Sequence, residues 1–192
     1  RCSRGCGSRL HLRRCDVPRS SDEVVVVLDV RPAARVGEHL RRRLALPVGK
    51  NIAELKKRAE AAGIPCIYVN DNFGKWQSDF KKIVARCTAE HATGKDFVKL
   101  LVPDDDDYFV LKPKHSGFYS TTLDLLLTHL NAKNLILTGI AGNNCVLFTA
   151  NDAYMRDFHL VVPSDCSAAV DAKVHRVAME QMRDVLKVDT TP

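Results

Sequence analysis

The strongest constraint on the fold is one continuous apolar run, VVVVLDV, at residues 24–30. A β-branched run without polar alternation is typical of a strand that is buried on both faces of a parallel sheet. Similar short runs, which we predict to be strands, follow at 64–70, 108–111, 134–138 and 159–162. Segments with helical spacing of their apolar residues alternate with these strands, at 51–62, roughly 79–88, 121–130, 143–155 and 171–186. This alternation predicts an α/β fold, a three-layer α/β/α sandwich around a mainly parallel, doubly wound, Rossmann-like sheet.

The length of 192 residues suits one sizeable hydrophobic core. We predict a single domain at 23–192, because residues 1–22 are Arg-rich and show no apolar periodicity. Residues 1–22 are expected to be disordered or to lie outside the domain. Residues 1–14 contain arginines but no acids, as mitochondrial presequences do, and that alternative stays open.

The formal net charge of +6 resides in residues 1–43, where 11 arginines face five acids. The rest of the chain balances 18 basic against 18 acidic residues. A nucleic-acid-binding domain usually has a basic face supported by a recognition motif, so we expect no nucleic-acid partner. No apolar run reaches the roughly 18–20 residues that cross a bilayer, and we expect no membrane partner.

The chain has seven cysteines, an odd number, and Cys66 and Cys166 lie in or beside apolar runs. Reduced thiols in a cytoplasmic protein are therefore expected rather than a disulfide framework. The pair Cys2 and Cys6 has a zinc-like spacing, but few ligands lie nearby to complete a site, and we expect no metal. The aspartates at 104–107 are interpreted as a solvated loop, because the Gly and Glu of a calcium-binding loop are missing.

Three reactive side chains lie at the carboxyl ends of predicted strands: Asp29 near the end of the first, and Lys112 and Cys145 just after two others. In an open parallel sheet the functional crevice lies outside the carboxyl ends of the strands. Cys145 also follows a glycine-containing turn at the predicted start of a helix, with Asn143 as its N-cap, and such a position favours the thiolate. Each residue also has a structural interpretation, as a strand end, a solvated lysine and a packing cysteine. A carboxylate, an ammonium and a thiol at one sheet edge nevertheless favour a catalytic site.

The chain resembles the isochorismatase-like cysteine hydrolases, the superfamily that includes nicotinamidases and N-carbamoylsarcosine amidase. The likeness runs from about residue 23 to residue 185 and rests on three segments. They are the apolar strand ending in Asp29, the run Lys112-Pro-Lys-His-Ser116-Gly-Phe118-Tyr-Ser-Thr121-Thr-Leu123, and the run Gly139-Ile-Ala-x-x-x-Cys145-Val-x-x-Thr149-Ala-x-Asp152-Ala153.

The resemblance implies a cofactor-free hydrolase that cleaves a small amide or a related C–N substrate through a thioester-type intermediate. Cys145 would attack the carbonyl carbon, Asp29 would take and return the proton, and Lys112 would orient Asp29. A cis peptide between Ile140 and Ala141 would direct the N–H groups of Ala141 and Cys145 at the developing oxyanion. The resemblance also implies a small-molecule substrate and a homo-oligomer.

Two departures from the family pattern keep an alternative function open. The Arg-rich segment at 31–43 lacks the polar amide expected after Asp29, so the chain could be a catalytically inactive member that acts as a binding or assembly module. Asp71-Asn72-Phe73 lacks the histidine with which nicotinamidases bind a metal, which argues against nicotinamidase activity. No G-x-G-x-x-G follows the first strand, which disfavours a nucleotide-binding domain. Three aromatic side chains either line a substrate pocket or pack the core: Trp76, Phe118 and Tyr119.

Overall fold

The computed structural model describes residues 22–29, 38–72, 79–90, 92 and 95–192. Its centre is a six-stranded sheet in the order β3-β2-β1-β4-β5, with the short β6 paired to the end of β4. All of these pairings are parallel. The strands are β1 (Glu23–Leu28), β2 (Cys66–Asp71), β3 (Tyr108–Lys112), β4 (Asn134–Ile140), β5 (His159–Val161) and β6 (Ser167–Ala168).

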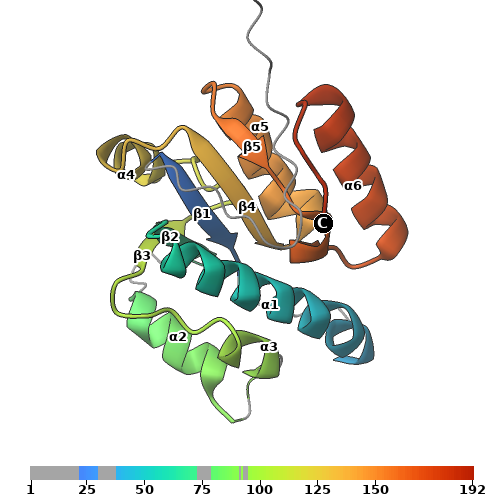
Figure 1. Ribbon diagram of the computed structural model, residues 1–192. Coiled ribbons are helices and arrows are strands. Elements are labelled where there is room, and N and C mark those ends of the chain that lie inside the picture. The colour runs from blue at the N-terminus through green and yellow to red at the C-terminus, as the bar shows by residue number, and fades with distance from the viewer. Residues whose placement is uncertain (1–21, 30–37, 73–78, 91, 93–94) are drawn as a thin grey trace, which may run out of the picture.

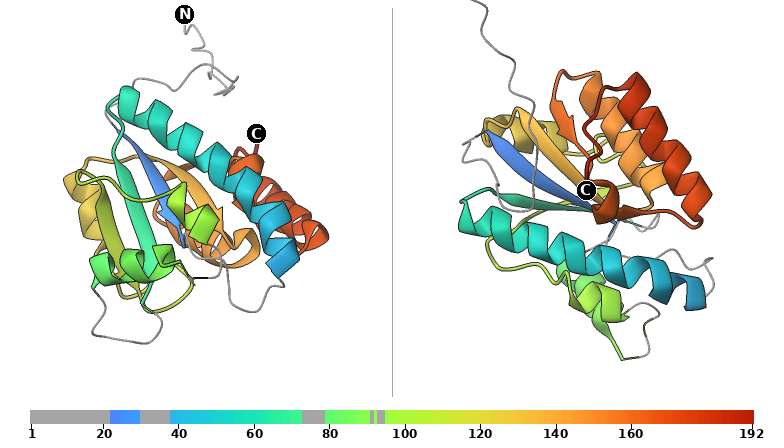
Figure 2. Two further views of the ribbon diagram at one scale, coloured as in Figure 1. Left: turned by 90° about the horizontal axis from the view of Figure 1, so that it is seen from below. Right: turned by 45° about the vertical axis from the view of Figure 1, so that its right-hand side comes forward.

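Helices cover both faces of this sheet, as Figures 1 and 2 show. One face carries α1 (Glu38–Ala61), α2 (Phe80–Thr88) and α3 (Lys95–Lys99), and the other carries α4 (Leu123–His129), α5 (Leu147–Tyr154) and α6 (Ala172–Val185). A π-helical turn, η1 (Gly142–Val146), leads into α5, and a 3-10 turn, η2 (Ser164–Cys166), precedes β6. The predicted three-layer α/β fold is thereby confirmed.

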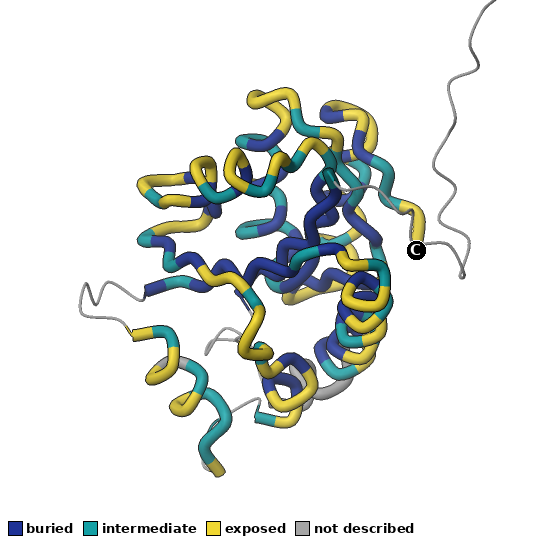
Figure 3. Tube along the Cα trace, turned by 60° about the vertical axis from the view of Figure 1, so that its left-hand side comes forward, coloured by how far each residue is buried: buried dark blue, intermediate teal, exposed yellow. Residues whose placement is uncertain are grey.

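The apolar run of β1 explains why the sheet needs helices on both faces. Val24 and Val26 belong to the core beneath α4, α5 and α6, whereas Val25 and Val27 belong to the core beneath α1 and α3. All four side chains are at most 1% exposed. The buried strands in the middle of the molecule are visible in Figure 3.

Helix α1 begins at Glu38, well before the start at residue 51 that the periodicity predicts. The helix continues through Pro47, although proline removes one intrahelical hydrogen bond. Ala45 and Val48 are buried in the core beneath α1 and α3, and this burial offsets the missing hydrogen bond. The Arg-rich segment therefore contributes its final residues to a packed helix. Residues 30–37 lie outside the described residues.

The loop at 104–107 is exposed at Asp104, Asp105 and Asp106, as predicted, but not at Asp107. The ammonium of Lys56 lies 2.6 Å from the carboxylate of Asp107 and also binds Asp104 and Glu60. The side chains of Lys56 and Asp107 are each only 7% exposed. Burial opposes the positive charge of Lys56, but its hydrogen bonds to the carboxylates raise its pKa overall. The loop is thus attached to α1 by a buried ion pair.

The four cysteines in the described part of the chain, at 66, 87, 145 and 166, are all free thiols, as expected for reduced cysteines. None of the helices in the described ranges is long and apolar enough to cross a bilayer. Residues 1–21 lie outside those ranges, so disorder of residues 1–22 stays a prediction.

Candidate active site

The register of the sheet brings the carboxyl ends of four strands, β1, β2, β3 and β4, to one edge. Leu28 pairs with Val69 on one side and with Gly139 on the other. Asp71, at the end of β2, pairs with Lys112 at the end of β3. Because these strands are parallel, their carboxyl ends meet, and the residues that follow them share one crevice.

Asp29 is held by two different donors. Its Oδ2 lies 2.6 Å from the ammonium of Lys112, and its Oδ1 accepts a hydrogen bond of 2.8 Å from the backbone N–H of Asp71. The backbone of Asp29 has a φ of 41°, in the left-handed region that non-glycine residues rarely adopt. Here the two bonds orient a carboxylate whose side chain is 11% exposed.

Lys112 is the centre of the cluster. Its side chain is fully buried, and its ammonium donates to the sulfur of Cys145 at 3.5 Å. A second carboxylate oxygen, from Asp71, lies 3.7 Å away. Burial disfavours the charge, but Asp29, Cys145 and Asp71 outweigh it and raise the pKa of Lys112. The lysine is therefore a permanent cation at neutral pH.

Cys145 differs from the thiolate that its position in the sequence predicts. Burial and the negative charge of Asp29 raise the pKa of its thiol to about 12, and the opposing effect of Lys112 is smaller. The residue is the fourth of the π-helical turn, and the N-cap is Ala141 rather than the predicted Asn143. At neutral pH the thiol therefore keeps its proton, and it needs a base to become a nucleophile.

The turn before Cys145 is built for close approach. Gly139 has a φ of 113°, and a Cβ on it would lie 1.9 Å from the carbonyl oxygen of Leu28. The next peptide bond, between Ile140 and Ala141, is cis. Ser167 on β6 donates a hydrogen bond of 3.1 Å to the carbonyl oxygen of Gly139. Only glycine fits at position 139, and β6 stabilises the turn through the hydrogen bond from Ser167.

The structure describes two of the three aromatic residues considered for the substrate pocket, Phe118 and Tyr119. Phe118 is buried in the core beneath α4, α5 and α6, where its ring lies 6.1 Å from that of Phe158. Tyr119 is 56% exposed, and Trp76 lies outside the described residues. Their role in a pocket stays a prediction.

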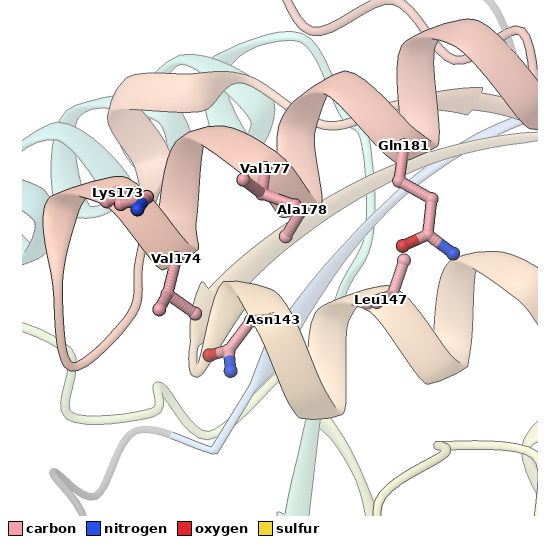
Figure 4. A pocket seen from close by; sticks show the side chains of 7 residues that line it. All are labelled: Asn143, Leu147, Lys173, Val174, Val177, Ala178 and Gln181. Carbon is pink, nitrogen blue, oxygen red and sulfur yellow. The ribbon is translucent and has the colours of Figure 1, made fainter.

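A groove of about 430 Å³ lies between α6 and the η1–α5 segment. Figure 4 shows Val174, Ala178 and Gln181 of α6 extending toward Asn143 and Leu147. The lining contains neither Asp29, Lys112 nor Cys145. The groove is therefore separate from the reactive cluster.

Asp71 also belongs to this site, although the sequence patterns predict no role for it. It satisfies the same strand-end criterion that identified Asp29 and Lys112, so the sequence did contain the signal. Its carboxylate is 27% exposed, whereas that of Asp29 is 11% exposed.

Among the described residues, no group of three or more His, Cys, Asp and Glu side chains could hold a metal ion.

The comparison with known sequences points to one family. The model of the isochorismatase domain matches residues 25–191. The isochorismatase family protein YaaI of Bacillus subtilis is 47% identical over 141 residues, which are 73% of this chain and 77% of that protein. The ureidoacrylate amidohydrolase RutB of Acinetobacter baylyi is 30% identical over 158 residues, which cover 71% of this chain and 64% of that protein.

Solved structures show the same fold. An isochorismatase family protein from Desulfovibrio vulgaris has a TM-score of 0.70 at 23% identity, with 89% of this chain and 94% of that chain covered. The N-carbamoylsarcosine amidase from Thermoplasma acidophilum has a TM-score of 0.67 at 23% identity, with 88% and 95% covered. At these identities the likeness concerns the fold alone.

Proposed function

Because the chain belongs to the isochorismatase family of hydrolases, we propose that it cleaves a small amide or ureido C–N bond with Cys145 as its nucleophile. The single observation that carries this proposal is the position of the Lys112 ammonium. It lies 2.6 Å from the Asp29 carboxylate and 3.5 Å from the Cys145 sulfur. An acid–base group, a cation and a thiol are thus in direct contact within a buried cluster.

In the first half-reaction Asp29 takes the proton of the Cys145 thiol while the sulfur attacks the substrate carbonyl carbon. The protonated Asp29 then gives this proton to the leaving nitrogen, the C–N bond breaks, and a thioester on Cys145 remains. The high thiol pKa suits this order, since the nucleophile forms only when a substrate is present. Lys112 holds the carboxylate in place and offsets the negative charge that moves between oxygen and sulfur.

In the second half-reaction Asp29 removes a proton from water, and the resulting hydroxide attacks the thioester carbonyl. The C–S bond breaks, the sulfur recovers its proton from Asp29, and the acid product leaves. During both steps the carbonyl oxygen becomes negatively charged. We assign its stabilisation to the N–H groups of Ala141 and Cys145, which follow the Gly139 turn.

The direct test is ammonia release from a panel of ureidoacrylate, N-carbamoylsarcosine and nicotinamide. These compounds are chosen because similar proteins are named ureidoacrylate amidohydrolase, N-carbamoylsarcosine amidase and nicotinamidase. We expect turnover of at least one amide or ureido compound by the wild type and none by Cys145→Ala. Cys66→Ala is the matched control, because it removes a buried thiol at the start of β2, at the end of that strand away from the site. Lys114→Met, an exposed lysine two residues from Lys112, is the control for Lys112→Met.

Mass spectrometry of the intact protein gives a second readout. Rapid acid quench during turnover should trap an acyl group on Cys145 in the wild type. If a wider panel of small amides gives neither turnover nor an acyl adduct, the chain is an inactive member of its family, and the proposal is wrong.

A further inference from the structure

Thr149, in the first turn of α5, connects the two segments that carry the lysine and the cysteine. Its hydroxyl donates a hydrogen bond of 2.7 Å to the carbonyl oxygen of Cys145. The hydroxyl oxygen of Thr149 in turn accepts a hydrogen bond of 2.9 Å from the backbone N–H of Gly117. Thr149 is fully buried, so no water can replace either bond. One hydroxyl therefore connects the η1 turn, which contains Cys145, to the loop that follows β3.

The loop that follows β3 packs closely on α5. Ser116 donates a hydrogen bond to the carboxylate of Asp152, one turn along α5 from Thr149. A Cβ on Gly117 would lie 3.4 Å from the methyl group of Thr149 and 3.0 Å from Leu123 of α4, so the backbone there lies against both helices. This loop begins directly after Lys112, which ends β3.

A hydrogen bond from threonine to the carbonyl oxygen four residues earlier is common in helices and needs no functional explanation. Thr128 in α4 makes that bond to Asp124 at 2.9 Å, at an exposed position. Thr149 differs because its hydroxyl is buried and also accepts from a different segment, and because the carbonyl oxygen it binds belongs to Cys145. Thr128 therefore serves as the control for Thr149, because it makes the ordinary helical bond but does not connect two segments.

We propose that Thr149 is a positioning residue that holds the Cys145 thiol against the Lys112 and Asp29 pair. It touches neither substrate nor the reacting atoms, and it acts through the backbone of Cys145 and Gly117. Placement matters at this scale, because a shift of about 1 Å between reacting groups costs as much as about 100-fold in rate. The inference rests on the proposed hydrolase function for its kinetic consequence, but the geometric consequence for Cys145 does not depend on catalysis.

The experiment compares Thr149→Val, Thr149→Ser, Thr128→Val and the wild type. Valine keeps the shape of threonine but can neither donate nor accept, whereas serine keeps both bonds. We expect Thr149→Val to lower kcat by about 10-fold to 100-fold with KM changed less than about twofold. Thr149→Ser and Thr128→Val should keep kcat within about twofold of the wild type.

The second readout is the pH dependence of Cys145 alkylation by iodoacetamide, mapped by peptide mass spectrometry. Burial and Asp29 together raise the thiol pKa from 9.0 to about 12. Loosening the site should reduce this shift, so the alkylation midpoint of Thr149→Val should fall by about one pH unit or more. Thr149→Ser and Thr128→Val should keep the wild-type midpoint.

Three results separate the alternatives. If Thr149→Val lowers the melting temperature but leaves kcat and the alkylation midpoint unchanged, the residue is only structural and the proposal is overturned. If the wild type hydrolyses nothing, the alkylation midpoints alone decide the placement of Cys145, while the hydrolase proposal fails independently. Should Thr149→Val not fold, Thr149→Ala removes the same two hydrogen bonds with a smaller side chain, and an unchanged alkylation midpoint in that variant overturns the proposal.

Discussion

Replacing Asp29 with asparagine should make Cys145 more reactive toward an alkylating agent and the enzyme less active. Asparagine preserves the shape of the side chain and can still accept from the backbone N–H of Asp71. It loses the negative charge that raises the thiol pKa and the capacity to take a proton. The two effects have opposite signs in two assays, which makes the prediction specific to the proposed roles.

The magnitude follows from the distances. The Lys112 ammonium lies 2.6 Å from the Asp29 oxygen and 3.5 Å from the Cys145 sulfur, so oxygen and sulfur are at most about 6.1 Å apart. At an effective dielectric constant of about 20, two unit charges at that distance repel each other by about 2.7 kcal/mol, which corresponds to about two pKa units. The thiolate fraction at pH 8 should rise about 100-fold. Because a less basic thiolate is a weaker nucleophile, alkylation should accelerate by only about 10-fold.

The assay is iodoacetamide labelling of Cys145 at pH 8, read by peptide mass spectrometry, beside kcat/KM on the best substrate of the panel. Loss of the general base should lower kcat/KM by about 100-fold to 10,000-fold. Asp71→Asn is the control, since its carboxylate lies 3.7 Å from Lys112 but is not among the main groups that act on the Cys145 pKa. If Asp29→Asn labels no faster than the wild type, or keeps more than a tenth of its activity, the assigned roles are refuted.

Three further predictions concern stability and pH. Lys56→Met leaves a buried carboxylate without its partner and should lower the free energy of unfolding by about 3 kcal/mol in urea titrations, whereas the exposed Lys57→Met should change it by less than about 0.5 kcal/mol. Gly139→Ala should cost at least about 3 kcal/mol or abolish soluble expression, because its Cβ would meet a backbone oxygen; Gly63→Ala, with a φ of 73° and open space, should cost about 1–2 kcal/mol. The pKa of Cys145 is about 12 in the fold and 9.0 ordinarily. The protonated thiol therefore stabilises the fold below pH 9, and this contribution is lost as the pH rises from 9 to 12. In urea titrations across that range, the free energy of unfolding of Cys145→Ala should fall less steeply than that of the wild type.

Much of the fold could be predicted from local patterns. The run at 24–30 predicts a strand buried on both faces, and the alternation of its valines between two cores confirms this. The start of α1 could not be predicted, because Pro47 and the arginines are poor local signals. The burial of Ala45 and Val48 becomes apparent only when the helix packs against the sheet. The two-residue strand β6 likewise depends on its pairing with β4 and carries no periodicity of its own.

The candidate site shows the same division. The strand ends predict that Asp29, Lys112 and Cys145 lie at one edge of the sheet. The structure places the Lys112 ammonium 2.6 Å from the Asp29 carboxylate and 3.5 Å from the Cys145 sulfur. Asp71 meets the same criterion, and the structure places its carboxylate 3.7 Å from the lysine. The thiolate predicted from the start of a helix was wrong, because burial and a neighbouring carboxylate outweigh the local backbone.

The sequence by itself determined the order of strands and helices, the parallel sheet and the three reactive residues, because hydrophobic periodicity and strand ends are local properties of the chain. Tertiary structure alone decided which oxygen faces which nitrogen, how deeply the lysine is buried and whether the thiol is charged. These quantities depend on the distance between charges and on the exclusion of water. Both arise only when segments distant in the sequence pack together, as Thr149 and Gly117 do.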